Sequence, residues 1–246
     1  MDGLPFFGYL PLSMRRRFYI LLALFSATCC GAAERNAISF TIASANLSDS
    51  TSQAYEDAGI RILQALKPDV VAIQEFNYKS GNSQDLVRKL FGPAYHFARE
   101  KGGARLPNGI LSRYPIVAFG QWDDPYVLNR KFAWATLQIP GPKPLHVVSV
   151  HLVQNRAERR IPEARLLLRL IREKFPAGDY VALCGDFNIA SRESEALAEL
   201  TGWFVDDHHP ADQEGNKNTN ANRNRPYDFV LPNPPPAPCH VPPTPP

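Results

Sequence analysis

Polar side chains of the kinds that bind metal ions or move protons follow several apolar segments of this chain. Asp186 and Asn188 come directly after the apolar stretch 180–184. Comparable positions at the ends of other apolar segments hold Asn46, Glu75, His151 and Asp228. Carboxylate and amide oxygens are ligands for hard divalent cations, and an imidazole with a pKa of ~6.5 can exchange protons near neutrality. Together these residues predict one shared site at the ends of buried strands.

Each of these residues also has an ordinary structural interpretation. Glu75 could be a salt-bridged strand end, and Asn46 could be a turn residue. Asp186 and Asn188 could form an Asx turn that closes the strand, and a lone histidine such as His151 is commonly structural. The chemical interpretation depends on finding them together, because a buried carboxylate is costly unless it is paired or bound to a cation.

The hydrophobic pattern predicts alternating strands and helices. Helices are expected at 55–66, 83–90, 163–174 and 193–200, with Ser83 as the N-cap of the second. Strands are expected at 38–45, 70–73, 95–98, 109–111, 116–120, 132–139, 145–152, 180–183 and 227–231. The sequence shows no internal repeat, and a chain of 246 residues is compatible with one large α/β domain.

Six short motifs follow one another along this framework: Ala45-Asn46-Leu47, Ile73-Gln74-Glu75, Asn108-Gly109-Ile110-Leu111-Ser112-Arg113, Ser149-Val150-His151-Leu152, Gly185-Asp186-Phe187-Asn188 and Tyr227-Asp228-Phe229. In their order and spacing the chain resembles the endonuclease/exonuclease/phosphatase superfamily, which includes pancreatic deoxyribonuclease, abasic-site endonucleases, neutral sphingomyelinases and inositol-polyphosphate phosphatases. The resemblance covers about residues 38–231. It implies an α/β (α+β) fold, a four-layer sandwich of two packed, mostly antiparallel β-sheets flanked by helices, with the site at one edge.

The resemblance also implies a metal site. Glu75 and Asn46 would hold a divalent ion, Mg²⁺ or Mn²⁺, through oxygen. Members of the family often carry an acid two residues after this asparagine, where the present chain has Ser48 followed by Asp49. The presence of a second metal ligand there, and so the choice between one metal ion and two, stays open.

The remaining motif residues match positions that act on the phosphoester. Asp186 would orient or deprotonate the attacking water, and Asn188 would donate to a phosphoryl oxygen. His151 would donate a hydrogen bond to the phosphate or protonate the leaving oxygen. Asn108 resembles a substrate-contacting position. Asp228 matches an aspartate that in the family pairs with a histidine from the final strand.

The segment 212–225, with its alternating asparagines, is too polar to be core and is expected to line a substrate groove or to be mobile. Thr219 and Arg225 are its candidates for phosphate contact. Residues 232–246 are rich in proline, which cannot donate to a sheet, and predict a disordered tail outside the domain. We therefore expect the final strand and its histidine to be missing, through loss of the carboxyl end or a shifted reading frame.

The first residues have the layout of a secretory signal, with Arg15 to Arg17 before an apolar run 18–27 and small residues through Ala33. Cleavage is expected after Ala33, which leaves a domain at 34–231 and the tail at 232–246. The predicted location is secreted or periplasmic, and a lipid anchor at Cys29 or Cys30 is the disfavoured alternative. The run is shorter than the ~20 residues of a membrane span, so stable membrane insertion is not expected.

Composition limits the partners of the processed chain. Removal of residues 1–33 takes three of 27 basic and one of 24 acidic residues, so the formal net charge falls from +3 to +1. A nearly neutral domain lacks the strong basic character that usually accompanies nucleic-acid binding. Only Cys184 and Cys239 remain, with Cys184 expected in the core, so no disulfide framework is predicted.

These observations predict a metal-dependent phosphoester hydrolase, a phosphodiesterase or nuclease that acts by in-line attack of water. The sequence has no serine-elbow motif or phosphate-binding glycine loop that would suggest a different mechanism. The partner is a phosphoester substrate, with nucleic acid among the candidates, and we expect a monomer. The alternatives are a phosphatase or sphingomyelinase-type hydrolase, and a catalytically impaired member that serves as an extracytoplasmic binding module.

Overall fold

The computed structural model describes residues 21–26, 39–46, 48, 57–78, 82–102, 105–207 and 209–234. Two five-stranded sheets lie face to face. The first has the order β1 (Leu21–Ser26), β2 (Ser39–Asn46), β3 (Val70–Gln74), β5 (Gly109–Ser112), β4 (His96–Arg99). The second has the order β10 (Asp228–Pro232), β9 (Tyr180–Asp186), β8 (Leu145–His151), β7 (Lys131–Leu137), β6 (Ile116–Asp123).

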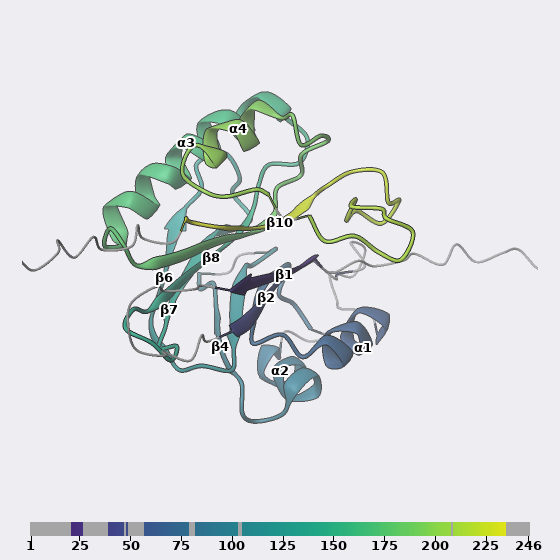
Figure 1. Cartoon of the computed structure of the whole chain (residues 1–246), viewed down its shortest axis with the longest axis vertical. Coiled ribbons are helices and arrows are strands. Elements are labelled where there is room, and N and C mark those ends of the chain that lie inside the picture. The colour runs from purple at the N-terminus through teal and green to yellow at the C-terminus, as the bar shows by residue number, and fades with distance from the viewer. Residues whose placement is uncertain are drawn as a thin grey trace, which may run out of the picture.

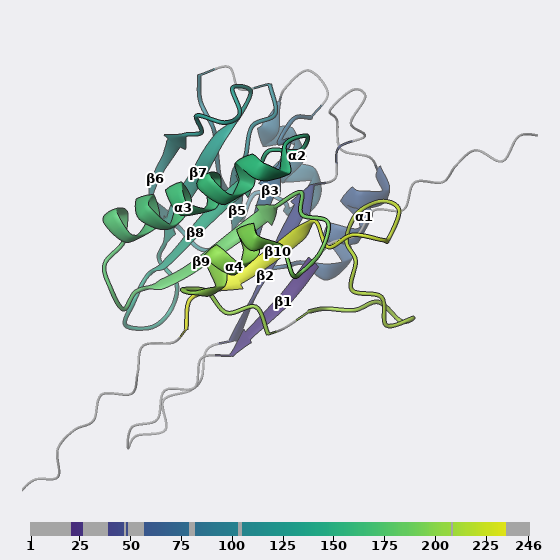
Figure 2. The same ribbon diagram turned by 90° about the horizontal axis from the view of Figure 1, so that it is seen from above.

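Helices cover the outer face of each sheet, as Figure 1 shows. Helices α1 (Asp57–Leu66) and α2 (Ser83–Phe91) lie against the first sheet, and α3 (Ala157–Lys174) and α4 (Glu195–Thr201) lie against the second. Figure 2 shows α3 and α4 from above, crossing over the second sheet. Among the described strands only β2–β3 and β8–β9 are parallel pairs. The predicted sandwich of mostly antiparallel sheets flanked by helices is confirmed.

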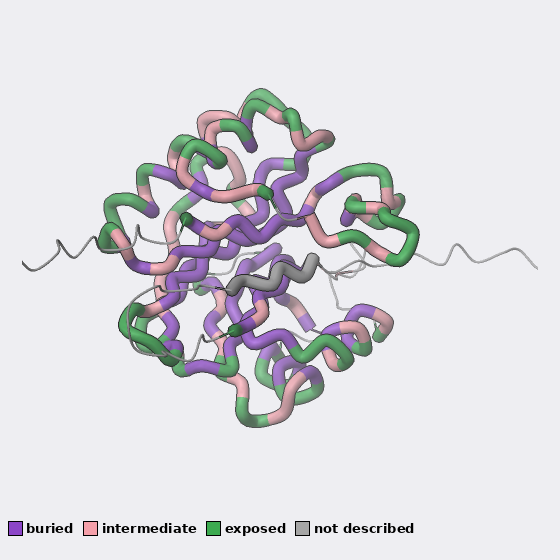
Figure 3. The backbone as a smooth tube through the Cα atoms, in the orientation of Figure 1, coloured by how far each residue is buried: buried purple, intermediate pink, exposed green. Residues whose placement is uncertain are grey.

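Alternation along the strands builds two apolar layers. In β3, Val70 and Ala72 belong to the cluster between the sheets, whereas Val71 and Ile73 pack under α1 and α2, because successive side chains point to opposite faces. The larger cluster continues beneath α3 and α4. Figure 3 shows these buried segments at the centre of the molecule. Cys184 is buried in this cluster, as predicted.

Several element boundaries differ from those predicted. Helix α3 begins at Ala157, before the predicted start at residue 163, and contains Pro162, whose lack of an N–H costs one helical hydrogen bond. The predicted cap Ser83 is wrong. Asn82 is the N-cap of α2, because its side chain accepts a hydrogen bond of 3.2 Å from the N–H of Asp85.

Strand β1 falls inside the segment predicted to be a leader. Leu21 to Ser26 pair antiparallel with β2, from Leu21 opposite Ser44 to Ser26 opposite Ser39. This strand therefore belongs to the sheet only in a chain that keeps its first residues. At the other end, β10 extends to Pro232, and Asn233 bonds to β9 through Val181. Most of the predicted tail, residues 235–246, lies outside the described residues. No helix in the described ranges is long and apolar enough to cross a membrane.

Gly185 is required where β8 and β9 approach each other. A Cβ atom at this position would lie 2.0 Å from the carbonyl oxygen of Val150, its register partner on β8. Since the obstacle is backbone, we expect Gly185→Ala to lower the free energy of unfolding by about 2–3 kcal/mol in urea denaturation. The control Gly202→Ala, where the nearest atom is 3.8 Å from the added Cβ, should change it by no more than about 0.5 kcal/mol. Equal losses in both variants would contradict this account.

Candidate functional site

The pairing of the strands brings the predicted residues to one edge of the sandwich. Asn46 and Glu75 lie at the carboxyl ends of β2 and β3, where Asn46 pairs with Gln74. His151 and Asp186 are register partners at the carboxyl ends of β8 and β9. Asp228 begins β10, which runs antiparallel to β9, and it pairs with Asp186. Both parallel pairs therefore end at the same edge.

The side chain of Asn46 joins the two sheets at this edge. Its Nδ2 lies 3.3 Å from Glu75 Oε1 and 3.1 Å from Asp186 Oδ2, so one amide donates to carboxylates of both sheets. His151 lies between the same carboxylates, with Nδ1 3.8 Å from Glu75 Oε1 and Nε2 3.6 Å from Asp186 Oδ2. Asn46, Glu75, His151 and Asp186 thus form one cluster, here called the edge cluster.

Buried polar side chains beneath the edge cluster form a bridge of hydrogen bonds between the two sheets. Gln74 donates from Nε2 to Ser149 Oγ at 3.0 Å, and Ser149 Oγ donates to the carbonyl of Ile73 at 3.2 Å. Ser44 Oγ donates to Gln74 Oε1 at 3.4 Å. Gln74, Ser149 and Ser44 are completely buried. Since unbonded polar groups are costly there, the bridge favours the one sheet packing that satisfies them.

Asn188 does not continue the strand. Strand β9 ends at Asp186, and Asn188 has a φ of +51°. Its N–H donates to Asp186 Oδ1 at 2.9 Å, which is the Asx turn that was the structural alternative. Its Nδ2 donates to the carbonyl of Leu152 at 2.9 Å. One amide hydrogen of Asn188 bonds to the backbone beside His151, and the other has no partner among the residues that the structure describes.

Arg130 is a buried residue of the site that the sequence analysis missed. Its Nε donates to the carbonyl of His151 at 2.5 Å and its Nη2 to that of Leu152 at 2.8 Å. Within the described ranges it is the one arginine or lysine that is buried. Burial lowers its pKa, and the nearby carboxylates, Asp186 first among them, oppose that shift. The sequence feature that could have pointed to Arg130 is its charge directly before the apolar strand 131–137.

Burial shifts the titration of the edge cluster and its neighbour. It raises the pKa of Asp186 to about 6, against the lowering effect of the hydrogen bonds from Asn46 and Asn188. Burial lowers the pKa of His151 well below its ordinary value, and the charge of Arg130 adds to this. Near neutrality Asp186 is therefore mainly ionised and His151 is neutral, which suits a hydrogen-bond donor better than a general acid.

Asp228 and Thr219 form a separate contact beside Asp186. The N–H of Asp228 donates to Thr219 Oγ1 at 2.8 Å. Burial, and next the charge of Asp186, raise the pKa of Asp228 well above its ordinary value. Its Oδ1 is buried without a hydrogen-bond partner among the residues that the structure describes. A side-chain hydrogen bond from Thr219 opposes this pKa shift, so the hydroxyl of Thr219 bonds both to the backbone and to the side chain of Asp228.

Asn108 lies at the same edge, whereas Arg225 does not contact the edge cluster. Asn108 directly precedes Gly109, the partner of Ile73, and its Nδ2 donates to the carbonyl of Lys131 at 2.6 Å. Its buried Oδ1 has no partner in the described part of the chain. Arg225 is exposed, and its guanidinium lies 3.1 Å from the hydroxyl of Tyr227.

The polar segment 212–225 is held by its own side chains. Asn220 Oδ1 accepts from the N–H groups of Asn224 and Arg225 at 2.9 and 2.8 Å. Asn216 Nδ2 donates to the carbonyl of Arg223 at 3.0 Å. The asparagines that made this segment too polar for the core therefore act as local backbone partners.

The carboxylates of the edge fit a hard divalent ion. No group of three or more His, Cys, Asp or Glu side chains arranged to hold a metal ion is found among the described residues. Mg²⁺ needs only one or two carboxylates, because it keeps several waters. Glu75 and Asp186, with Asp228 beside them, outnumber the one buried cation, Arg130. Ser48 donates to Glu75 where the resemblance suggested a further acid.

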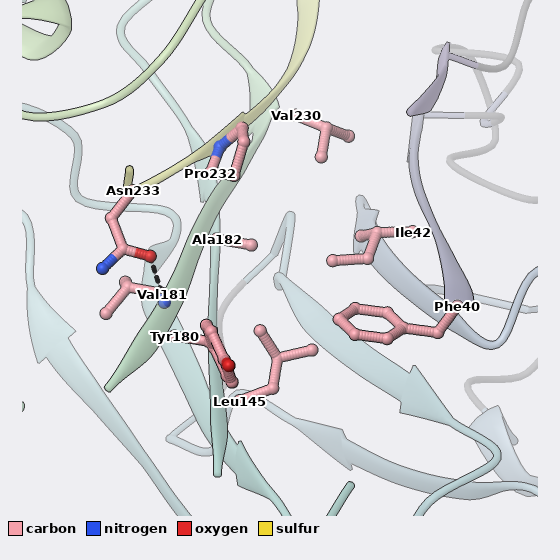
Figure 4. A pocket seen from close by; sticks show the side chains of 9 residues that line it. All are labelled: Phe40, Ile42, Leu145, Tyr180, Val181, Ala182, Val230, Pro232 and Asn233. Carbon is pink, nitrogen blue, oxygen red and sulfur yellow. Dashed lines mark hydrogen bonds between the residues drawn. The ribbon is translucent and has the colours of Figure 1, made fainter. Parts of the chain in front are cut away.

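An apolar pocket between the sheets lies at the opposite end of the sandwich (Figure 4). It is lined in part by Leu145 and Tyr180, which begin β8 and β9, whereas His151 and Asp186 end these strands. Its one amide side chain, Asn233, already accepts from the N–H of Val181 at 2.8 Å. The side chains that line this pocket include no carboxylate, imidazole or thiol, and the edge cluster is the candidate site.

Comparison with known proteins agrees with this geometry. The family model described as the Endonuclease/Exonuclease/phosphatase family matches residues 60–246. The chain belongs to this family. No curated protein sequence matches the chain. Family membership makes the chain a member of a group of phosphoester hydrolases.

Solved structures show the same fold at low sequence identity. A family protein from Bacteroides thetaiotaomicron has a TM-score of 0.59 and 16% identity over 79% of this chain and 83% of its own. A mannosyl-6-phosphatase from Bacteroides thetaiotaomicron VPI-5482 has a TM-score of 0.57 and 14% identity, with coverage of 79% and 85%. A humanized TDP2 of D. rerio has a TM-score of 0.56 and 19% identity, with coverage of 82% and 85%.

The raised pKa of Asp186 predicts a stability cost. Because its folded-state pKa is about 6 against an ordinary 3.8, its favourable contribution is present below pH ~4 and is lost as the pH rises to 6. At pH 7 without divalent ions, Asp186→Asn should raise the free energy of unfolding by roughly 2–3 kcal/mol, and the gain should vanish below pH ~4.

Urea denaturation at several pH values measures this difference. Asp123→Asn is the control, since its carboxylate is exposed and pairs with Lys131 at the surface, where ion pairs contribute little. A destabilised Asp186→Asn protein at pH 7 would contradict the prediction.

Proposed function

We propose that this protein is a metal-dependent phosphoester hydrolase of the phosphodiesterase or nuclease type, which acts by in-line attack of water on phosphorus. The observation that carries the proposal is the convergence of Asn46, Glu75, His151 and Asp186, from both sheets, on one edge of the sandwich. Family membership supports the same reaction class. None of these groups is a nucleophile of the serine or cysteine type, and water is the proposed attacking group.

Glu75 is the proposed ligand of Mg²⁺ or Mn²⁺, with Asn46 beside it. In the described structure Asn46 presents its Nδ2 to Glu75, so its oxygen would face the ion only after the amide turns over. When bound, the divalent ion neutralises charge that develops on the phosphoryl oxygens. The surplus of carboxylates over Arg130 supports binding of a cation at this edge.

The protein groups supply orientation and proton transfer. Asp186, mainly ionised near neutrality, orients the water and accepts its proton. Asn188 donates its free amide hydrogen, and the neutral imidazole of His151 donates its N–H, to phosphoryl oxygens. Asn108 and Thr219 are proposed substrate contacts, whereas Arg225 could reach substrate only from the surface.

The proposed substrate class includes several kinds of phosphoester. The named neighbours include a mannosyl-6-phosphatase and a TDP2 protein, and at their low identity they support the fold alone. Without residues 1–33 the formal net charge of the chain is small. This favours small diesters, or diesters on uncharged surfaces, over nucleic acid as substrates. Secretion to an extracytoplasmic compartment is part of the proposal and rests on the leader-like sequence 15–33.

Metal removal is the first test of this function. The purified protein with Mg²⁺ should hydrolyse a chromogenic phosphodiester, and excess chelator should abolish turnover. Glu75→Gln should lower kcat/KM by roughly 100-fold or more, because the amide keeps the shape of the side chain but removes the ligand charge. The exposed Glu158→Gln is the matched control and should retain full activity.

Two further measurements separate the alternatives. Plasmid DNA, an abasic duplex, sphingomyelin, a chromogenic diester and a phosphate monoester should be compared side by side, with diesters expected to be hydrolysed fastest. Calorimetry with Mg²⁺ and a diester substrate would detect binding without turnover. That result, or activity indifferent to chelator and to Glu75→Gln, would refute the metal-dependent hydrolase and favour a binding module or a different mechanism.

A further inference from the structure

A second group of buried charges lies behind the edge cluster and has no part in the chemistry proposed above. It consists of Asp124 between β6 and β7, Arg130 before β7, and Glu163 on α3. Glu163 is completely buried, and Asp124 and Arg130 are 5% and 6% exposed. Buried charges of this kind persist only where their hydrogen bonds are satisfied, so their partners indicate what they do.

The first partner is the backbone that carries His151. Arg130 donates to the carbonyls of His151 and Leu152 at 2.5 and 2.8 Å. The N–H of Val153 donates to both carboxyl oxygens of Glu163, at 3.2 Å to Oε1 and 3.0 Å to Oε2. The segment that follows β8 is thus held by these side chains and by one further strand hydrogen bond, from the N–H of Leu152 to the carbonyl of Asp186 at 2.9 Å.

Helix α3 supplies a second contact to the same segment. Arg160 donates from Nε to the carbonyl of Val153 at 2.8 Å and from Nη2 to that of Gln154 at 2.6 Å. The residues 151–154 therefore have a side-chain partner at each of their four carbonyl groups and at the Val153 N–H.

The carboxyl groups of Asp124 and Glu163 face each other. Each group affects the pKa of the other through a side-chain hydrogen bond, which two carboxyl groups can make only if one of them keeps its proton. Asp124 Oδ1 accepts from the N–H of Tyr126 at 2.8 Å, and its buried Oδ2 has no donor among the described residues unless Glu163 carries a proton. Burial, and next this hydrogen bond, raise the pKa of Glu163 to about 9. Glu163 is thus the partner that keeps the proton.

We propose that Asp124 and Glu163 share one proton and, together with Arg130, form a positioning unit that fixes segment 151–154 and thereby the imidazole of His151. The unit does not touch substrate, so its members are positioning residues. The role of this unit rests on the proposed function, because the unit is proposed to orient His151 for hydrolysis. With one shared proton, the pair carries a single negative charge, which Arg130 balances.

Charge balance explains why the shared proton matters. The charged groups that face Glu163 are Asp124 from the β6–β7 connection, Arg130 from the start of β7, and Arg160 from its own helix. Loss of the proton would leave two adjacent buried carboxylates, which repel each other. Glu163 would then move away from Asp124 and displace the N–H of Val153, two residues from His151.

The kinetic test compares a conservative and a disruptive substitution of Glu163. Glu163→Gln keeps a donor toward Asp124 and an acceptor for Val153, so it should retain at least about a third of the wild-type kcat near neutrality. Glu163→Ala removes both contacts and should lower kcat roughly 10- to 100-fold, with KM and the Mg²⁺ dependence nearly unchanged. Asp179→Asn, a buried carboxylate at the opposite end of β9, is the matched control for lost stability and should leave kcat unchanged.

The pH profile separates positioning from general loss of structure. Wild-type kcat/KM should fall as the pH rises through about 9, and Glu163→Gln, which has no proton to lose there, should lack this decline. An alkaline decline that persists unchanged in Glu163→Gln would overturn the proposal. Equal kcat values for Glu163→Gln and Glu163→Ala would overturn it as well.

A direct titration keeps this inference independent of the proposed function. In protein labelled with ¹³C-glutamate, the Glu163 carboxyl should titrate near 9, and Asp124→Asn should shift its midpoint downward. The His151 ring signals should change with the same midpoint. Titration of Glu163 near its ordinary 4.5 would refute the shared proton even in an active enzyme. An inactive protein that shows the shared titration would refute the proposed hydrolase and leave the proton pair established.

Discussion

Buried negative charge at one edge of the sandwich is the constraint around which the site is organised. Glu75, Asp186 and Asp228 are almost fully buried there, and Arg130 is the single buried cation within the described ranges. Burial penalises the charged forms, which raises the pKa of Asp186 and Asp228. The fold tolerates this charge through directed hydrogen bonds, above all from Asn46 to both sheets. A site whose buried carboxylates outnumber its cationic side chains is suited to bind a metal cation.

Two parallel strand pairs make this concentration possible. Because β2–β3 and β8–β9 each end at the same edge, residues far apart in the chain meet without long loops. The Gln74–Ser149 hydrogen bond, buried between the sheets, ties one pair to the other just beneath the cluster. Gly185 lets β9 approach β8 closely enough for His151 and Asp186 to be neighbours. Position in the sheet, more than loop conformation, therefore sets the geometry.

The strands and the edge residues were predictable from the sequence because both are local signals. Alternating apolar residues mark a strand, and a polar residue at its end needs no knowledge of the partner strand. Arg130, Asp124 and Glu163 were not predictable in the same way, since their roles depend on contacts between separate elements, such as that of Arg130 with His151, 21 residues further along the chain. The Asx turn at Asn188 was one of two interpretations that the sequence left open, because a positive φ depends on the bond to Asp186 and not on residue type alone. The pairing of 21–26 with β2 follows tertiary packing that a leader-like composition conceals.

Arg130 connects the charge balance of the site to the state of its histidine. The guanidinium bonds to the carbonyl of His151 itself, so its positive charge is fixed close to the imidazole. That charge and burial both disfavour the imidazolium, and the ring is neutral near pH 7. A neutral imidazole can donate one hydrogen bond but is a poor acid for a leaving group. The same contact that positions His151 therefore also limits it to a role as donor, and in the proposed mechanism the main charge compensation at phosphorus is left to the divalent ion.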